Sequence, residues 1–181
     1  MAFSVQDDSG SVQAANAYVA VAEFKAFQDE RGGNYSLFTD SQIEQSVVKA
    51  TDYLDSRYAF VGVQRSVDQG TQFPRYLVGQ EFGASYPRSP LSGLPRALRH
   101  ATCLLAMRAL GGATLLPDPV YNPEGQVTGR RSKVGPVESE ITFAAAPTAA
   151  QQEAPRYPDV DLLLRNAGLL GPTGSRRLYR G

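Results

Sequence analysis

The clearest fold signal in this chain is the stretch TDSQIEQSVVKATDYLDSRY, residues 39–58. Thr39 and Asp40 are both favoured helix N-caps, and two pairs have the spacing of a capping box, Thr39 with Gln42 and Ser41 with Glu44. Downstream, apolar side chains recur every three or four residues, as on the buried face of a helix: Ile43, Val47, Ala50, Leu54 and Tyr58. The stretch therefore predicts an amphipathic helix that ends near Phe60.

Three further helices are predicted around it. The first covers residues 22–31 and stops at Gly32-Gly33. Another covers residues 95–110, where Pro95 suits a helix start and Gly111-Gly112 ends the apolar pattern. The last covers residues 158–166, with acidic side chains in its first turn and Arg165 in its last. The stretches 61–94 and 111–132 are rich in glycine and proline and are expected to be loops.

One strand is predicted over residues 133–143. Val137, Ser139, Ile141 and Phe143 alternate there with polar residues, which is the period of a strand. A lone strand is not stable, so it needs a partner. That partner is either a hairpin strand from residues 120–128 or a neighbouring copy of the chain.

These elements predict a mainly α protein. We expect a small helical-bundle domain with a short β-hairpin element, extended loops and a C-terminal arm. Residues 1–17 are expected to be a flexible segment and residues 18–143 the helical domain with its β element. Residues 144–181 are expected to hold a linker, a short helix and a basic arm.

Composition limits the possible chemistry. The chain has 181 residues, a formal net charge of +0, one cysteine and one histidine. A wholly basic nucleic-acid binder, an intrachain disulfide and zinc sites built on several cysteines or histidines are therefore not expected. No apolar run approaches the ~20 residues that span a bilayer, and residues 1–10 lack a signal-peptide pattern. No phosphate-binding glycine loop or nucleophile elbow is present, so we expect no cofactor, metal or catalytic site.

The few reactive side chains fit structural roles. His100 lies in the predicted helix 95–110, where a half-buried histidine is the alternative to a general base. Cys103 falls in an apolar stretch and is expected in the core. Glu138 and Glu140 share a strand face, either as a charged edge or as an acid–base pair. On the helix 39–58, Asp52 and Asp55 are expected in solvent or paired with Arg57 or Lys49.

Two basic runs could bind a partner. They are residues 130–133, which hold two arginines and a lysine, and the tail with Arg176, Arg177, Tyr179 and Arg180. Arginines next to Tyr179 could stack on single-stranded bases or dock on an acidic protein surface, and a solubilising tail is the third reading.

The order of these segments resembles a phage protein family. The relevant stretches are AYVAVAEFKAF (17–27), ATDYLDSRY (50–58), FPR (73–75), GLPRALRHATCLLAMRAL (93–110), SKVGPVESEITF (132–143) and YPDVDLLLRNAG (157–168). Together they resemble the head–tail connector, or head-completion adaptor, proteins of tailed phages. Some members of that family carry the label DnaT-like single-stranded-DNA-binding protein. Phe73 and Phe143 depart from the family pattern, where Trp and Tyr are common.

The resemblance implies a virion structural protein at the head–tail neck, assembled in the host cytoplasm. It implies a dodecameric homo-oligomeric ring between the portal protein and a tail terminator or tail-tube protein. Double-stranded DNA would pass without sequence-specific binding, and no membrane is involved. The portal-docking arm would comprise Val160, Leu163, Leu164, Leu169, Leu170, Arg176, Arg177, Tyr179 and Arg180. An inter-subunit strand would comprise Val137, Ser139, Ile141 and Phe143.

Two other functions stay open. One is a single-stranded-DNA-binding accessory protein of replication, which needs a basic surface with stacking aromatic rings. The other is an enzyme centred on His100 or on the pair Glu138 and Glu140. The basic residues are spread along the sequence and tryptophan is absent, so we expect the connector function and no enzymatic activity.

Overall fold

The computed structural model describes residues 2–76, 93–116, 129–134, 137–142 and 156–171. The chain divides into a helical unit, residues 1–115 and 156–181, and a hairpin unit, residues 116–155. The described elements are mainly helical with a short hairpin, which confirms the predicted fold class.

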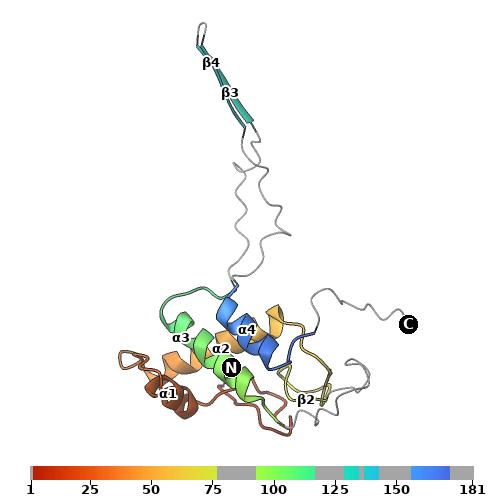
Figure 1. Ribbon diagram of the computed structural model, residues 1–181. Coiled ribbons are helices and arrows are strands. Elements are labelled where there is room, and N and C mark those ends of the chain that lie inside the picture. Colours follow the sequence, from red (N-terminus) through yellow and green to blue (C-terminus); the bar gives the residue numbers. More distant parts are fainter. Residues whose placement is uncertain (1, 77–92, 117–128, 135–136, 143–155, 172–181) are drawn as a thin grey trace, which may run out of the picture. The chain divides into compact units, whose positions relative to one another are not determined.

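Four helices form the described part of the helical unit (Figure 1). They are α1 (Val21–Asp29), α2 (Asp40–Arg57), α3 (Arg96–Leu110) and α4 (Pro158–Asn166). The central packing is between α2 and α3, and α3 also contacts α1 and α4. None of the helices in the described ranges is long and apolar enough to cross a membrane.

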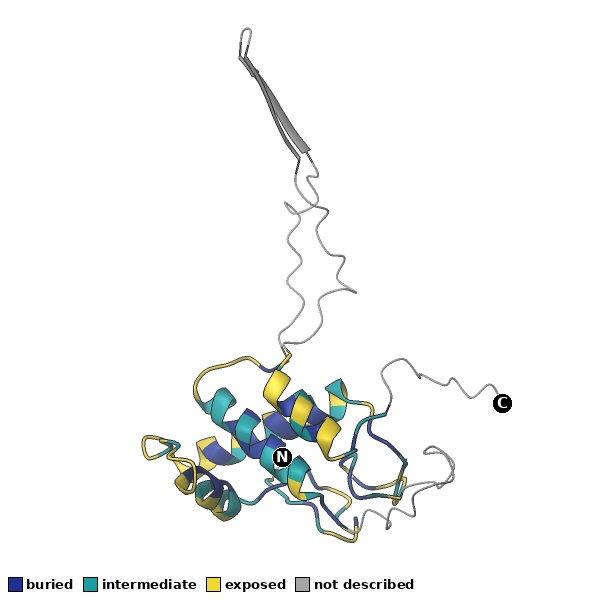
Figure 2. Cartoon of the chain, in the orientation of Figure 1, coloured by how far each residue is buried: buried dark blue, intermediate teal, exposed yellow. Residues whose placement is uncertain are grey.

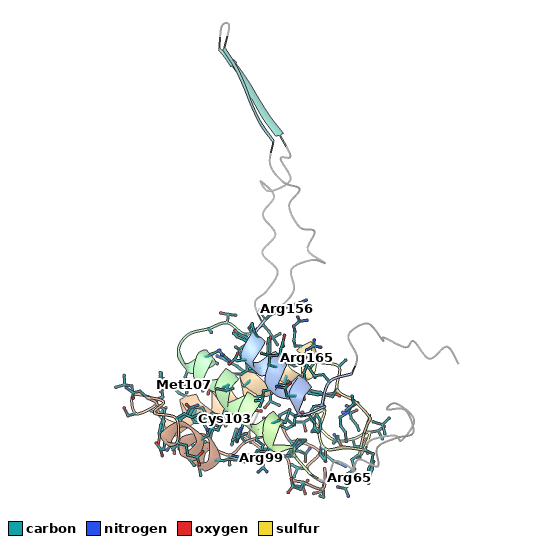
Figure 3. The ribbon with its side chains drawn as sticks, in the orientation of Figure 1. Arg65, Arg99, Cys103, Met107, Arg156 and Arg165 are labelled. Atoms are coloured by element: carbon teal, nitrogen blue, oxygen red, sulfur yellow. The ribbon has the colours of Figure 1, made fainter. Side chains whose placement is uncertain are left out.

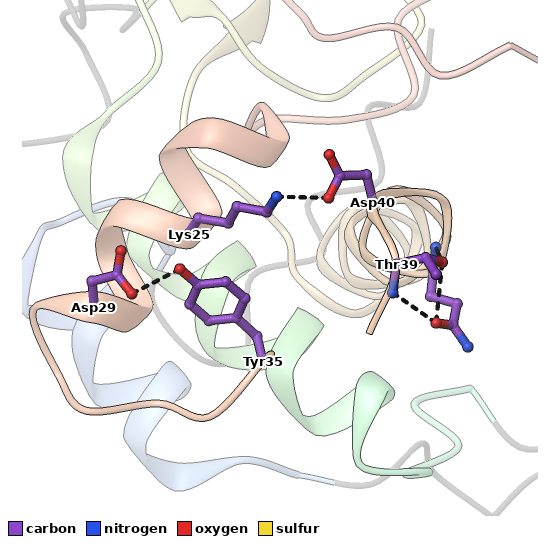
Figure 4. Close-up of polar contacts among 6 residues, drawn as sticks. Lys25, Asp29, Tyr35, Thr39 and Asp40 are labelled. Atoms are coloured by element: carbon purple, nitrogen blue, oxygen red, sulfur yellow. Dashed lines mark hydrogen bonds and ion pairs between the residues drawn. The ribbon is translucent and has the colours of Figure 1, made fainter. Parts of the chain in front are cut away.

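Local signals set the helix boundaries. The Thr39 Oγ1 accepts the Gln42 N–H at 3.4 Å, and the Gln42 Oε1 accepts the Thr39 N–H at 2.9 Å, so the predicted capping box forms (Figure 4). Helix α3 has Pro95 as its N-cap, and α4 has the predicted bounds. Helix α2 ends at Arg57, a few residues earlier than predicted, because Tyr58 has extended backbone angles.

Two polar contacts hold the α1–α2 connection (Figure 4). The Lys25 Nζ lies 2.6 Å from the Asp40 Oδ1 at the start of α2. The Tyr35 hydroxyl donates to the Asp29 Oδ1 at 2.7 Å. The first contact joins α1 to the start of α2, and the second joins the connection to the end of α1.

The apolar core of the helical unit lies between the helices (Figure 2). Its largest fully buried side chains come from every helix and from the segments between them: Tyr18, Phe24, Ile43, Tyr53, Leu54, Phe73, Leu98, Leu105, Leu164 and Leu169. Cys103 is also buried, as expected for a small core residue.

The C-terminal segment folds onto this core. Val160, Leu164 and Leu169 are buried. The Val61 N–H donates to the Leu169 carbonyl at 3.0 Å, and Leu170 forms an antiparallel bridge with Phe60. The apolar side of α4 therefore already has a partner within the helical unit.

An ion pair closes the point where the chain leaves and re-enters the helical unit. The Arg108 Nη2 of α3 lies 2.5 Å from the Asp159 Oδ2 of α4. The same guanidinium lies over the Tyr157 ring, 4.8 Å from its centroid. The end of α3 and the start of α4 are thus joined directly.

The N-terminal segment differs from the predicted flexible residues 1–17. Val5 and Ala17 form a parallel bridge, and the Gln6 N–H donates to the Ala17 carbonyl at 2.8 Å. The Ser4 N–H donates to the Asn16 Oδ1 at 2.9 Å. Residues 2–17 therefore form a bridged loop. The contacts that hold it are not predicted by any local sequence pattern.

Two small antiparallel sheets complete the description. In the helical unit, β1 (Val63–Gln64) pairs with β2 (Arg75–Tyr76), within the stretch predicted as a long loop with room for a short strand or helical turn. In the hairpin unit, β3 (Gly129–Val134) pairs with β4 (Val137–Thr142), from Val134 opposite Val137 to Gly129 opposite Thr142. The strand predicted over 133–143 is thus divided between two strands, and its partner is 129–134 instead of 120–128.

Candidate functional site

A partly buried polar junction joins three segments that lie far apart in the sequence. The Tyr18 hydroxyl donates to the Asp55 Oδ1 of α2 at 2.5 Å. The Asp55 Oδ2 accepts the Gln72 N–H at 3.0 Å, and the Tyr18 oxygen accepts the Phe73 N–H at 3.2 Å. This junction fixes the segment just before β2 against α2.

Burial dominates the electrostatics of this junction. It raises the pKa of the Asp55 carboxyl to about 6, although the hydrogen bonds from Tyr18 and Gln72 oppose the shift. Burial, and then the neighbouring Asp55, also raise the pKa of Tyr18, which keeps its hydroxyl a donor. The expectation that Asp55 is solvated or paired with Arg57 or Lys49 is wrong, because its partners come from other segments.

Arg75 holds the β1–β2 ribbon from its inner side. Its Nε donates to the Val61 carbonyl at 2.9 Å, and its Nη2 donates to the Gly62 carbonyl at 2.5 Å. Its Nη1 donates to the side chain of Gln72 at 2.7 Å. The Arg75 guanidinium therefore serves the fold, and the ribbon presents its other face to solvent.

That outer face carries an arginine beside an exposed aromatic ring. Val63 lies opposite Tyr76 in the register, and Arg65 follows two residues after Val63. Tyr76 is 46% exposed and is the one strongly exposed aromatic ring among the described residues. The Arg65 Nε donates to the Tyr76 hydroxyl at 3.1 Å, and its Cζ lies 5.3 Å from the ring centroid. We call Arg65 and Tyr76 the ribbon patch.

Asp8 positions the arginine of this patch. The Arg65 Nη1 donates to the Asp8 carbonyl at 3.1 Å, while the Asp8 Oδ1 accepts the Leu94 N–H at 2.8 Å. In Figure 3, Arg65 and Arg99 lie on the side of the helical unit away from Arg156. An exposed ring beside an oriented guanidinium can stack on a flat ligand and bind an anionic group.

A second basic group lies between α1 and α3. The Arg31 Cζ is 3.8 Å from the Phe27 ring centroid, and the His100 ring is 4.9 Å from the same ring. The Arg96 Nε donates to the His100 Nε2 at 3.3 Å. We call Arg31, Arg96 and His100 the α1–α3 cluster. His100 is half-buried, and its hydrogen-bond partner among the described residues is Arg96.

The residues predicted as a portal-docking arm are mostly inside the helical unit. Val160, Leu164 and Leu169 are core residues, and Leu163 and Leu170 are half-buried. Arg176, Arg177, Tyr179 and Arg180 lie outside the described residues. The apolar side of α4 is therefore buried against its own core, and the docking role assigned to these residues stays an untested prediction.

The residues predicted as an inter-subunit strand fall in the hairpin unit. Val137, Ser139 and Ile141 belong to β4, which pairs with β3 of the same chain. Phe143 lies outside the described residues. Pairing of β4 with a neighbouring copy stays an untested prediction. Glu138 and Glu140 face Lys133 and Arg131 in the register.

The described residues hold no group of three or more His, Cys, Asp or Glu side chains that could bind a metal ion. The paired carboxylates of Asp52 and Asp55 on α2 do not form such a group. Within the described ranges, the ribbon patch and the α1–α3 cluster each place arginine beside an aromatic ring, and they are the candidate binding surfaces considered below.

Comparison with protein families gives one match. Residues 1–181 match the family described as "Putative DnaT-like ssDNA binding protein". The chain belongs to this family. Searches of curated proteins and of solved structures find no significant match.

The family match overturns the connector function expected from the sequence. It indicates a single-stranded-DNA-binding family and gives no support to a virion protein with portal, tail-terminator or tail-tube partners in a dodecameric ring. Of the six stretches that suggested a connector, five lie in the helical unit, such as residues 50–58 at the end of α2, and one, residues 132–143, lies in the hairpin unit. These stretches specify the fold and do not specify a connector function.

Proposed function

We propose that this protein binds single-stranded DNA through the ribbon patch. The observation that carries the proposal is the exposed Tyr76 ring with the Arg65 guanidinium beside it on β1–β2. The family description supports the same ligand. Sequence analysis missed this surface, since Arg65 and Tyr76 meet only when two strands of two residues each pair.

A single strand suits this surface better than a duplex. Bases in a duplex are stacked on one another, whereas an unpaired base can leave its neighbours and lie on an aromatic side chain. Stacking on Tyr76 needs only the flat face of a base, so it tolerates any sequence. Binding is then non-specific, as expected for a surface without a set of base-edge donors and acceptors.

Arg65 supplies the charge for the phosphate backbone. Its contacts with Tyr76 and Asp8 use Nε and one hydrogen of Nη1. They fix the plane of the guanidinium and leave Nη2 to donate to a phosphate oxygen. Since the net charge of the chain is +0, attraction to DNA comes from local patches and falls steeply with salt.

The same proposal assigns the protein a binding role and no catalytic one. His100 contacts Phe27 and Arg96, and neither is a nucleophile that a general base could activate.

The test is fluorescence anisotropy with a labelled oligo(dT) across a salt series. Tyr76→Leu removes the ring, and we expect it to weaken binding ~5- to 100-fold, the equivalent of one stacked base at about 1–3 kcal/mol. Tyr76→Phe keeps the ring and loses only the hydroxyl, so it should stay close to the parent. Equal losses in the two variants would refute stacking.

Charge is tested separately. Arg65→Gln should lower the slope of log K against log salt by about 0.7, the value for one phosphate contact on a single strand. Arg156→Gln is the matched control, because Arg156 is an exposed arginine away from Arg65 in Figure 3. If both variants change the slope equally, the effect is overall charge and the ribbon patch is not the site.

A further inference from the structure

The α1–α3 cluster gathers basic groups around a ring that is not itself accessible. Phe27 is only 6% exposed, yet both Arg31 and His100 pack against it. Since the ring is covered, this surface cannot stack a base as Tyr76 can. What it presents to solvent is positive charge.

The charges in this cluster are incompletely neutralised. Arg96 is exposed and forms no ion pair with any described residue. The only ion pair of Arg31 within the described ranges is a 3.5 Å contact with the adjacent, exposed Glu30. The Nη1 of Arg99, next to His100, is 3.3 Å from the Glu23 Oε1, and the buried Arg99 Nε has no hydrogen-bond partner among the described residues. The surface therefore favours an anion.

The His100 imidazole lies among positive charges. Its Nε2 accepts from Arg96, so the imidazole is neutral and carries its proton on Nδ1. Burial lowers its pKa, and the nearby guanidiniums of Arg31, Arg96 and Arg99 lower it further against the opposing charge of Glu30. A bound anion would offset these positive charges and favour the imidazolium.

Asp8 connects this cluster to the ribbon patch. Its carbonyl accepts from Arg65, and its carboxylate accepts from Leu94, two residues before Arg96 at the start of α3. Asp8 therefore holds both the guanidinium of the ribbon patch and Leu94, the residue before the N-cap of the helix that carries Arg96 and His100.

We propose that Arg31, Arg96 and His100 form a phosphate site that holds the backbone of the strand bound at the ribbon patch. The inference rests on the proposed function. In the bound state Nε2 takes a proton from solvent, Arg96 releases its hydrogen bond to that nitrogen, and both groups donate to phosphate oxygens. Binding then takes up one proton, so affinity rises as pH falls through the pKa of the bound-state imidazole.

The single histidine of the chain makes this measurable. The imidazole proton signals in an NMR spectrum report on His100 alone, and their pH titration gives its pKa with and without oligo(dT). We expect oligo(dT) to raise the pKa of His100. Arg96→Gln and Arg31→Gln should each weaken oligo(dT) binding by several-fold and lower the salt slope by about 0.7. Arg156→Gln again serves as the control.

The outcomes separate this inference from the proposed function. If oligo(dT) binds and Tyr76→Leu weakens it, while the His100 titration does not move, the ribbon patch stands and the phosphate site is overturned. If inorganic phosphate shifts the pKa of His100 and oligo(dT) does not, the site binds free anions, and its assignment to DNA is overturned. If oligo(dT) fails to bind at any salt concentration, both proposals are overturned.

Discussion

The Tyr18–Asp55 junction makes a specific prediction about stability and pH. Burial raises the pKa of Asp55 to about 6 in the folded protein, against an ordinary value of 3.8, which applies to the unfolded chain. Below 3.8 both states are protonated, and the junction carries no charge penalty. As pH rises from 3.8 through 6, the unfolded chain ionises first, and the stability contributed by Asp55 is lost.

The size of the effect follows from that difference. A shift of about two pKa units corresponds to about 3 kcal/mol in the free energy of unfolding. Since Asp55 is half-buried and part of the carboxyl is screened by solvent, about 3 kcal/mol is an upper limit. Other carboxyl groups, such as Asp159, have lowered pKa values and change stability in the opposite direction.

The perturbation that isolates Asp55 is Asp55→Asn. The amide has nearly the shape of the carboxyl and does not ionise, although its NH2 group faces the Gln72 N–H. This mismatch lowers the free energy of unfolding of Asp55→Asn by an amount that does not depend on pH. Any change with pH in the stability difference between the two proteins therefore comes from the ionisation of Asp55. We expect the stability of Asp55→Asn relative to the parent to rise by up to about 3 kcal/mol between pH 4 and pH 7.5.

The assay is urea unfolding followed by far-ultraviolet circular dichroism at several pH values, with unfolding free energies extrapolated to water. The other carboxyl groups contribute equally to the unfolding free energies of the parent and of Asp55→Asn. Their contributions therefore cancel when one free energy is subtracted from the other. A stability difference that is flat across this pH range would mean that Asp55 is fully solvated, and the reasoning about the junction would be refuted.

Three further changes test the packing of the helical unit by thermal or urea unfolding. Gly93→Ala should destabilise by roughly 1–3 kcal/mol, because Gly93 has a φ of +77° and a Cβ there would lie 2.5 Å from the Asp8 carboxylate; an unchanged melting temperature would contradict this. Leu164→Ala should cost about 2–5 kcal/mol because the side chain is fully buried, whereas Leu162→Ala, at a position 58% exposed, should change stability by less than about 0.5 kcal/mol; equal effects would show that α4 does not pack as described. Thr39→Ala removes the capping box of α2 and should cost about 1 kcal/mol, unless water replaces both bonds without loss.

Helices were predictable here because their signals are local. The capping box at Thr39, and the prolines at the starts of α3 and α4, lie within a few residues of the boundaries that they define. The apolar spacing on α2 also predicted its buried residues, including Val47 and Leu54. Such patterns depend only on the geometry of one helix.

The candidate site was not predictable in the same way. Tyr18 and Asp55 are 37 positions apart, and the sequence around Asp55 shows only a polar residue on a helix. The two-residue strands that join Arg65 to Tyr76 are too short for a strand period. Sequence patterns therefore indicated which elements form, and the surface that they build depends on contacts between elements.

The link between Arg108 and Asp159 makes the chain modular. The chain leaves the helical unit after residue 115 and re-enters it at residue 156, near the Arg108–Asp159 ion pair. Residues 116–155 are therefore an insertion, and deleting them removes no core helix or strand of the helical unit. A short glycine–serine linker in their place should give a smaller protein with the same four helices. Such a deletion would also let the oligonucleotide affinity of the helical unit be measured without the basic stretch at residues 130–133. The same architecture should accept insertions of different length and sequence at this point while the helical scaffold is retained.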